Sequence, residues 1–146
     1  MRATLLGPAD HFPTTTGCPM ATQSVPAGFP LPNDAEMDTE LNLHDLAVTR
    51  PEATFFMRAS GTSLVGDGVF DGDLLVVDRS ITPRPGMVVI AAINGELTVK
   101  RLGKHLGMPA LLSSNPEFPP IPLAGQENEA WGVVTYVLHS LISTPR

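Results

Sequence analysis

From Thr54 onward, hydrophobic residues fall in short runs with the length and composition of β-strands. The runs cover residues 54–58, 73–78, 86–93, 96–102, 110–113 and 131–142, and they are rich in Val, Leu and Ile. Such residues favour the pleated, half-buried surface of a sheet. Asn94-Gly95 separates two of these runs and is a strong signal for a tight hairpin. The pattern predicts a mostly β, compact antiparallel fold over residues 41–146.

The first 40 residues follow a different pattern. Six of the 15 prolines precede Asn33, and the residues between them show no sustained helical or strand period. Proline removes a backbone donor and restricts the residue before it. We therefore expect residues 1–40 to form a flexible arm. A short helix is expected after it, over residues 43–48, with Asn42 as its N-cap and with Leu43, Leu46 and Ala47 as its apolar face.

Composition narrows the class of function. The net charge is −6, which disfavours general binding to phosphate backbones, because that requires Lys and Arg. Cys18 is the only cysteine, so no disulfide can form within the chain, and a reducing compartment is compatible. No stretch approaches about 18 consecutive apolar residues, so a membrane span is not expected. These observations predict a cytoplasmic protein whose partners are other proteins.

Two residues suggest a catalytic pair. Ser63 stands in the turn Ala59-Ser60-Gly61-Thr62-Ser63-Leu64, and Lys100 stands on the strand run Glu96 to Leu102. A serine needs a base to become a nucleophile, and a neutral lysine can serve as that base. Strand alternation puts Lys100 on one face with Thr98 and Leu102. Neutral Lys100 requires an apolar surrounding, which we expect from residues such as Leu64 and the valine-rich strands. The alternatives are a lysine on an exposed strand face and an ordinary Ser-Gly loop.

We interpret most of the other candidate residues as structural. Asp67, Asp71 and Asp73 lie among glycines but lack the order of an EF-hand, so we interpret them as turn residues. The four histidines lack the spacing of metal ligands. Ser60 is a second candidate nucleophile, although it precedes the glycine and can bond to the turn backbone. We therefore expect neither a metal nor a cofactor.

Three segments together resemble the UmuD branch of the LexA-type self-cleaving serine peptidases. They are Phe56-Met57-Arg58-Ala59-Ser60-Gly61-Thr62-Ser63-Leu64, Asp71-Gly72-Asp73-Leu74-Leu75-Val76-Val77-Asp78, and Gly95-Glu96-Leu97-Thr98-Val99-Lys100-Arg101-Leu102. The similarity runs from about Gly28 to the C-terminus. It implies a β-fold of the LexA and signal-peptidase type, preceded by a flexible arm.

The resemblance implies roles for individual residues. Ser63 is implied as the nucleophile and Lys100 as the general base, with an oxyanion site that we expect at the backbone N–H groups of Thr62 and Ser63. The implied cut lies between Ala27 and Gly28, which Phe29-Pro30 follows. Two departures stand out. Leu64 replaces the usual methionine, and Pro26 removes a donor next to the cut.

The resemblance also implies partners. Family members bind RecA filaments on single-stranded DNA, which stimulates self-cleavage after DNA damage. The trimmed form is implied to be a homodimer that joins an error-prone Y-family DNA polymerase (UmuC-like) in translesion synthesis. Only 27 residues precede Gly28, so we expect no helix-turn-helix repressor domain and no sequence-specific DNA binding. The alternatives are a polymerase-binding regulator without proteolysis and a signal-peptidase-like protease.

Overall fold

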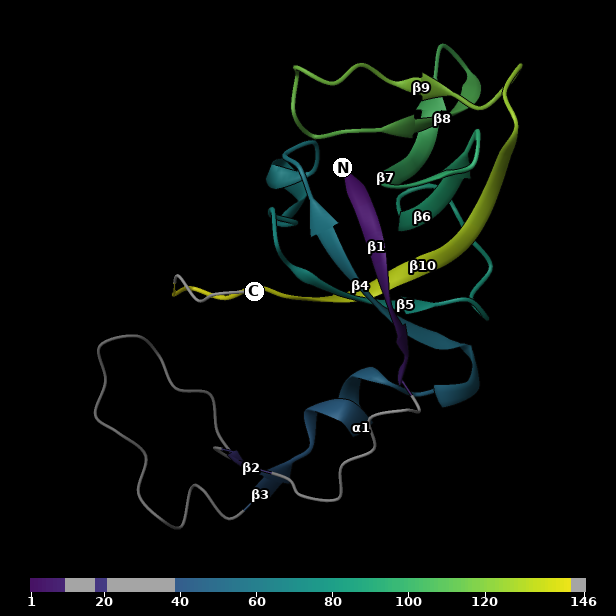
Figure 1. Cartoon of the computed structure of the whole chain (residues 1–146). Coiled ribbons are helices and arrows are strands. Elements are labelled where there is room, and N and C mark those ends of the chain that lie inside the picture. Colours follow the sequence, from purple (N-terminus) through teal and green to yellow (C-terminus); the bar gives the residue numbers. More distant parts are fainter. Residues whose placement is uncertain (10–17, 21–38, 143–146) are drawn as a thin grey trace.

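The computed structural model describes residues 1–9, 18–20 and 39–142, and its main feature is one eight-stranded sheet. The strands lie in the order β1-β4-β5-β10-β6-β7-β8-β9, and β1 also pairs with β7. The six strands from β1 to β7 in that order therefore close on themselves, with β8 and β9 extending from β7 (Figure 1). All pairings are antiparallel. The predicted mostly β, antiparallel fold is confirmed.

Most of the described secondary-structure elements are strands, and the helices are few and short. The strands are β1 (Arg2–Pro8), β2 (Cys18–Met20), β3 (Thr39–Leu41), β4 (Thr54–Ser60), β5 (Leu74–Asp78), β6 (Val88–Ile93), β7 (Glu96–His105), β8 (Met108–Leu112), β9 (Ile121–Pro122) and β10 (Asn128–Leu138). The helix α1 spans Leu43–Ala47, and the 3-10 turns η3 and η4 span Pro51–Ala53 and Val65–Asp67. β2 and β3 pair with each other in a separate two-stranded sheet.

The local signals in the sequence identify the hairpin and the helix. Asn94 and Gly95 have positive φ angles of 49° and 83° and join β6 to β7, with Ile93 opposite Glu96. Both angles fit a type I′ turn, which matches the twist of the flanking strands. Asn42 accepts a hydrogen bond from the Asp45 N–H at 3.2 Å and caps α1, as predicted. Leu43 and Leu46, however, remain exposed.

Strand β1 is the main difference from the expected pattern, because the sequence predicts no strand before residue 40. β1 pairs along β4 from Arg2, opposite Ser60, to Pro8, opposite Phe55. Only Ala3 within it is buried. A strand with one small buried side chain gives almost no hydrophobic alternation, so its formation depends on tertiary pairing. The division of the chain at residue 40 stays a prediction.

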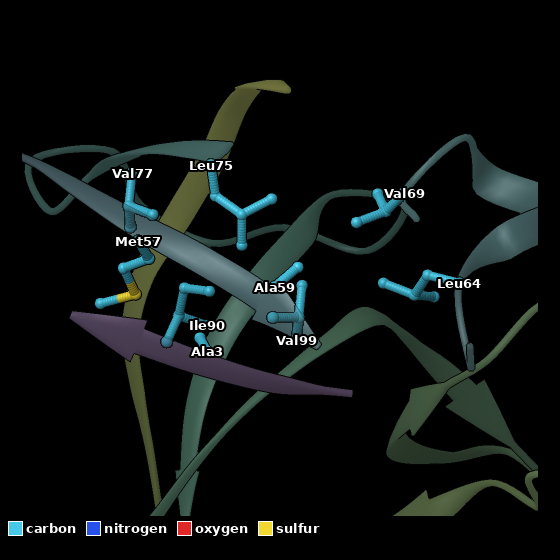
Figure 2. Close-up of a cluster of buried hydrophobic side chains, with 9 residues drawn as sticks. All are labelled: Ala3, Met57, Ala59, Leu64, Val69, Leu75, Val77, Ile90 and Val99. Atoms are coloured by element: carbon cyan, nitrogen blue, oxygen red, sulfur yellow. The ribbon is translucent and has the colours of Figure 1, made fainter. Parts of the chain in front are cut away.

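The core lies on the inner face of the closed strands (Figure 2). Its nine buried residues come from β1, β4, β5, β6, β7 and the turn after Ser63: Ala3, Met57, Ala59, Leu64, Val69, Leu75, Val77, Ile90 and Val99. A second cluster packs on the other face of β6 and contains Val89, Ala91, Leu111 and Val133. β6 and β7 therefore bury residues on both faces.

Candidate active site

Ser63 lies in a turn that several hydrogen bonds fix in place. The Ser63 side chain is fully buried, and its carbonyl accepts a hydrogen bond from the Ser114 N–H at 2.9 Å. The carbonyl of Thr62 accepts from the Asn115 side chain at 3.2 Å. On the other side of the turn, the Gly61 N–H donates to Asp71 at 2.9 Å. The hydroxyl is therefore held at the end of β4 by contacts from the segment that follows β8.

Lys100 is buried in the middle of β7. Only 4% of its surface is exposed, and it stands opposite Val89 of β6. Leu102, two residues along β7, packs against the second cluster, and Val99 points into the core on the other face. The alternation predicted for β7 is confirmed. Burial lowers the pKa of Lys100 from its ordinary value of 10.5, because a charged ammonium is disfavoured away from water.

An aromatic ring lies beside the ammonium group. Lys100 Nζ is 5.0 Å from the centroid of the Phe118 ring. Leu64, which the sequence analysis expects to surround Lys100, instead packs in the core with Val99. Phe118 lies in the proline-rich segment that connects β8 to β9. The apolar surrounding of Lys100 therefore includes a residue that strand patterns do not identify.

The α-amine of Met1 joins the two predicted residues. It donates a hydrogen bond to Ser63 Oγ at 3.1 Å. It also interacts with Lys100, and this contact counteracts part of the decrease in the Lys100 pKa. Burial, together with the nearby charge of Lys100, lowers the pKa of the amine to about 6. Ser63 Oγ is thus bonded to an amine whose pKa responds to the nearby Lys100.

A cavity of about 380 Å³ adjoins Lys100 at the start of β1. It is lined by Met1 and Arg2 of the chain start and by residues of the β6–β7 hairpin and of β9: Ile93, Asn94, Glu96, Leu97, Thr98, Lys100 and Ile121. The cavity therefore combines apolar side chains with charged and polar ones next to Lys100.

An ion pair ties the turn after Ser63 to the strand that carries Lys100. Both Arg101 Nε and one of its terminal nitrogens donate to Asp67 Oδ1, at 3.0 and 2.6 Å. Asp67 belongs to η4 and Arg101 follows Lys100, so the contact fixes the two elements relative to each other. The guanidinium also donates to the Gly86 carbonyl. Nothing in the spacing of Asp67 and Arg101 along the sequence predicts this ion pair.

The other residues predicted from the sequence are the cleavage site and the aspartates among the glycines. Ala27 and Gly28 lie outside the described residues. Asp71 and Asp73 serve turns, since they accept hydrogen bonds from the Gly61 and Phe70 N–H groups. Asp73 also pairs with His139 at 2.5 Å. Within residues 1–9, 18–20 and 39–142, no group of three or more His, Cys, Asp or Glu side chains is arranged to hold a metal ion.

A known protein family and several known proteins match most of this chain. Residues 19–135 match the model of a family described as Peptidase S24-like. The chain is 45% identical over 129 residues to protein MucA of Salmonella typhimurium, covering 87% of this chain and 86% of that protein. It is 41% identical over 140 residues to protein SamA of the same species, covering 96% and 98%.

A further relative is a repressor. The LexA repressor of Pectobacterium carotovorum is 42% identical over 106 residues, which cover 73% of this chain and 52% of the repressor. The similarity is thus confined to about half of the repressor.

No helix in the described part of the chain is long and apolar enough to cross a membrane.

Proposed function

Because the chain belongs to the UmuD-type branch of the S24-like peptidase family, we propose that it cuts its own backbone between Ala27 and Gly28. Ser63 is the nucleophile and Lys100 the general base. This branch contains self-cleaving proteins of the SOS response. The observation that carries the proposal is that Ser63 and Lys100 are both buried, with the Met1 amine bonded to Ser63 Oγ and Lys100 nearby.

The burial of Lys100 supports its role as a base. An ordinary lysine is almost entirely protonated at neutral pH and cannot take a proton from serine. Burial lowers the pKa of Lys100, so a larger fraction of the side chain is neutral. A neutral amine next to Ser63 can take the hydroxyl proton during attack, which is the serine-lysine variant of the triad.

The proposed reaction proceeds through an acyl-enzyme. Ser63 Oγ bonds to the Ala27 carbonyl carbon while its proton passes to Lys100 Nζ. The oxyanion is stabilised by the N–H groups of Thr62 and Ser63. The bond to the Gly28 nitrogen then breaks, and Lys100 returns its proton to that nitrogen. Water attacks the Ser63 ester and gives its proton to Lys100, which passes this proton to Ser63 Oγ as the ester bond breaks. The Ala27 carboxyl group is released and loses its own proton to solvent.

Eleven residues separate the scissile bond from β3. The 11 residues from Gly28 to Asp38 connect the bond to β3, which begins at Thr39. A fully extended segment of this length spans about 35–40 Å. Intramolecular binding gives the bond a high effective concentration, so control depends on how often the segment occupies the site. A RecA filament on single-stranded DNA stimulates cleavage in this proposal by favouring the bound state.

We test the cut by mass spectrometry of the purified chain without RecA. Incubation at about pH 10 is expected to yield residues 1–27 and 28–146, because the neutral fraction of Lys100 rises by about tenfold per pH unit below its pKa. Ser63→Ala is expected to yield neither fragment, and Ser60→Ala is the matched control that retains cleavage. A cut elsewhere, or undiminished cleavage in Ser63→Ala, contradicts the proposal.

The trimmed chain is proposed to form a homodimer that joins a Y-family DNA polymerase. Leu43 and Leu46 of α1 line an apolar groove of about 340 Å³ together with Tyr136 and Leu138 of β10, and all four are exposed. Exposed apolar patches often mark protein interfaces. A second copy of the chain is the proposed occupant. Light scattering of the purified trimmed form is expected to give the mass of two chains, whereas the mass of one chain contradicts the homodimer.

A further inference from the structure

The first residue of the chain is bound in the cleft of Ser63 and Lys100. The Met1 carbonyl accepts hydrogen bonds from the Val99 N–H at 2.9 Å and from Thr98 Oγ1 at 2.8 Å. Its amine donates to Ser63 Oγ at 3.1 Å. Both polar backbone groups of Met1 are therefore bound at the site, next to Lys100.

The cleft accepts a backbone at close range. A Cβ on Gly61 would lie 3.2 Å from the Met1 Cα, and Gly61 has a φ of 106°. Glycine permits both this φ and the close approach of another backbone. On the other side of Met1, β7 supplies a strand edge. The site between β4 and β7 thus binds an extended chain through its backbone, as in β-strand addition.

The Met1 amine occupies the position that a departing amine needs during cleavage. In the proposed reaction, Ser63 attacks the Ala27 carbonyl, and the Gly28 nitrogen receives a proton close to Ser63 Oγ and Lys100. Met1 places its own nitrogen next to both groups. Two chain segments cannot occupy this volume together.

We propose that the cleft between β4 and β7 binds an extended peptide backbone and that the start of β1 occupies this cleft. Met1 must leave before Ala27-Gly28 can reach Ser63. This inference rests on the proposed function and adds regulation to it. The start of β1 acts as a competing ligand of the active site, and any partner that draws it away increases self-cleavage.

Only the beginning of β1 has to move. In the strand register, β1 pairs with β7 only at Arg2, opposite Thr98, whereas residues 2–8 pair along β4. The exposed ion pair between Arg2 and Glu96, at 2.8 Å, lies outside the buried site. Strand ends open more readily than strand centres. Withdrawal of Met1 and Arg2 therefore leaves the core residues of β4 and β7 in place.

Arg2→Glu tests the inference, because it turns the Arg2–Glu96 attraction into repulsion without changing Ser63 or Lys100. Lys104→Glu is the matched control: it makes the same charge change at an exposed position on β7. Hydrogen exchange of the Val99 N–H, measured in the uncleaved chain with Ser63 intact, reports how often Met1 leaves. We expect Arg2→Glu to increase both this exchange and the cleavage rate of the Ser63 chain by about twofold to fivefold, the size of an exposed ion pair. Lys104→Glu is expected to change neither.

Ala3→Asp is a second, stronger variant. It places a carboxylate at a position that is 8% exposed in the core, which opposes binding of the start of β1. We expect faster Val99 exchange and faster cleavage than in Arg2→Glu. Exchange of the Leu75 N–H, in the centre of the core, distinguishes local opening from global unfolding.

The outcomes separate the two proposals. Faster Val99 exchange without faster cleavage overturns the inference and leaves the proposed function intact. A Val99 N–H that is unprotected in the parent chain, or unchanged in both variants, overturns the occupancy of the cleft by Met1. Absence of any cut at Ala27-Gly28 in the parent chain and in every variant, even at about pH 10, refutes the proposed function instead.

Discussion

Replacing Lys100 with Met is expected to lower the rate of self-cleavage at Ala27-Gly28 by about a thousandfold or more between pH 7 and pH 10. Methionine has a similar shape but cannot take the proton of Ser63. Lys100→Arg is expected to be as inactive, because a guanidinium stays protonated at every accessible pH. Lys104→Met is the control, since Lys104 is an exposed lysine on the same strand.

Lys100→Met also has an expected effect on the stability of the folded chain. Burial lowers the pKa of Lys100 in the folded chain below 10.5, so the unfolded chain binds a proton more tightly. Folding therefore carries a cost at neutral pH that disappears as the pH rises through 10.5. Lys100→Met removes this cost and is expected to be at least as stable as the parent chain at pH 7. Retention of more than about a tenth of the parent cleavage rate in a folded Lys100→Met chain contradicts the assignment of the base.

Met57→Ala is expected to lower the free energy of unfolding by about 2–5 kcal/mol. Met57 lies on β4, is completely buried, and packs with Ala3, Ile90 and other core residues (Figure 2). Truncation removes apolar contacts and leaves a cavity where β1 closes the sheet. The change is measured by urea denaturation of the Ser63→Ala chain, so that cleavage does not interfere.

Met108→Ala is the matched control for the core. Met108 is 56% exposed at the start of β8, and its truncation is expected to cost less than about 0.5 kcal/mol. Equal losses in the two variants contradict the assignment of the core to the inner face of the closed strands.

Much of the fold can be predicted from local patterns. The Asn94-Gly95 turn and the alternation along β7 identify a hairpin, one face of which carries Lys100. Asn42 identifies the start of α1. These features follow from backbone geometry and side-chain period within a few residues, which sequence patterns report well.

Features that depend on contacts between residues far apart in the sequence are harder to predict from it. β1 contains one buried side chain, Ala3, and forms through pairing with β4, so periodicity does not reveal it. Phe118 lies in a proline-rich connection, and only the path of that segment brings the ring beside Lys100. Nothing in the sequence indicates that Met1 binds Ser63. The position of Ala27 and Gly28 in the folded chain stays a prediction.

The central claim is that the pKa of Lys100 is lowered. An NMR titration of its side chain in the uncleaved Ser63→Ala chain tests this claim most directly. Selective ¹³C labelling of lysine, with Lys100→Met to assign the signal, gives the pKa of this one amine. We predict a Lys100 pKa below 10.5, because burial disfavours the ammonium. A Lys100 pKa at or above 10.5 contradicts the account.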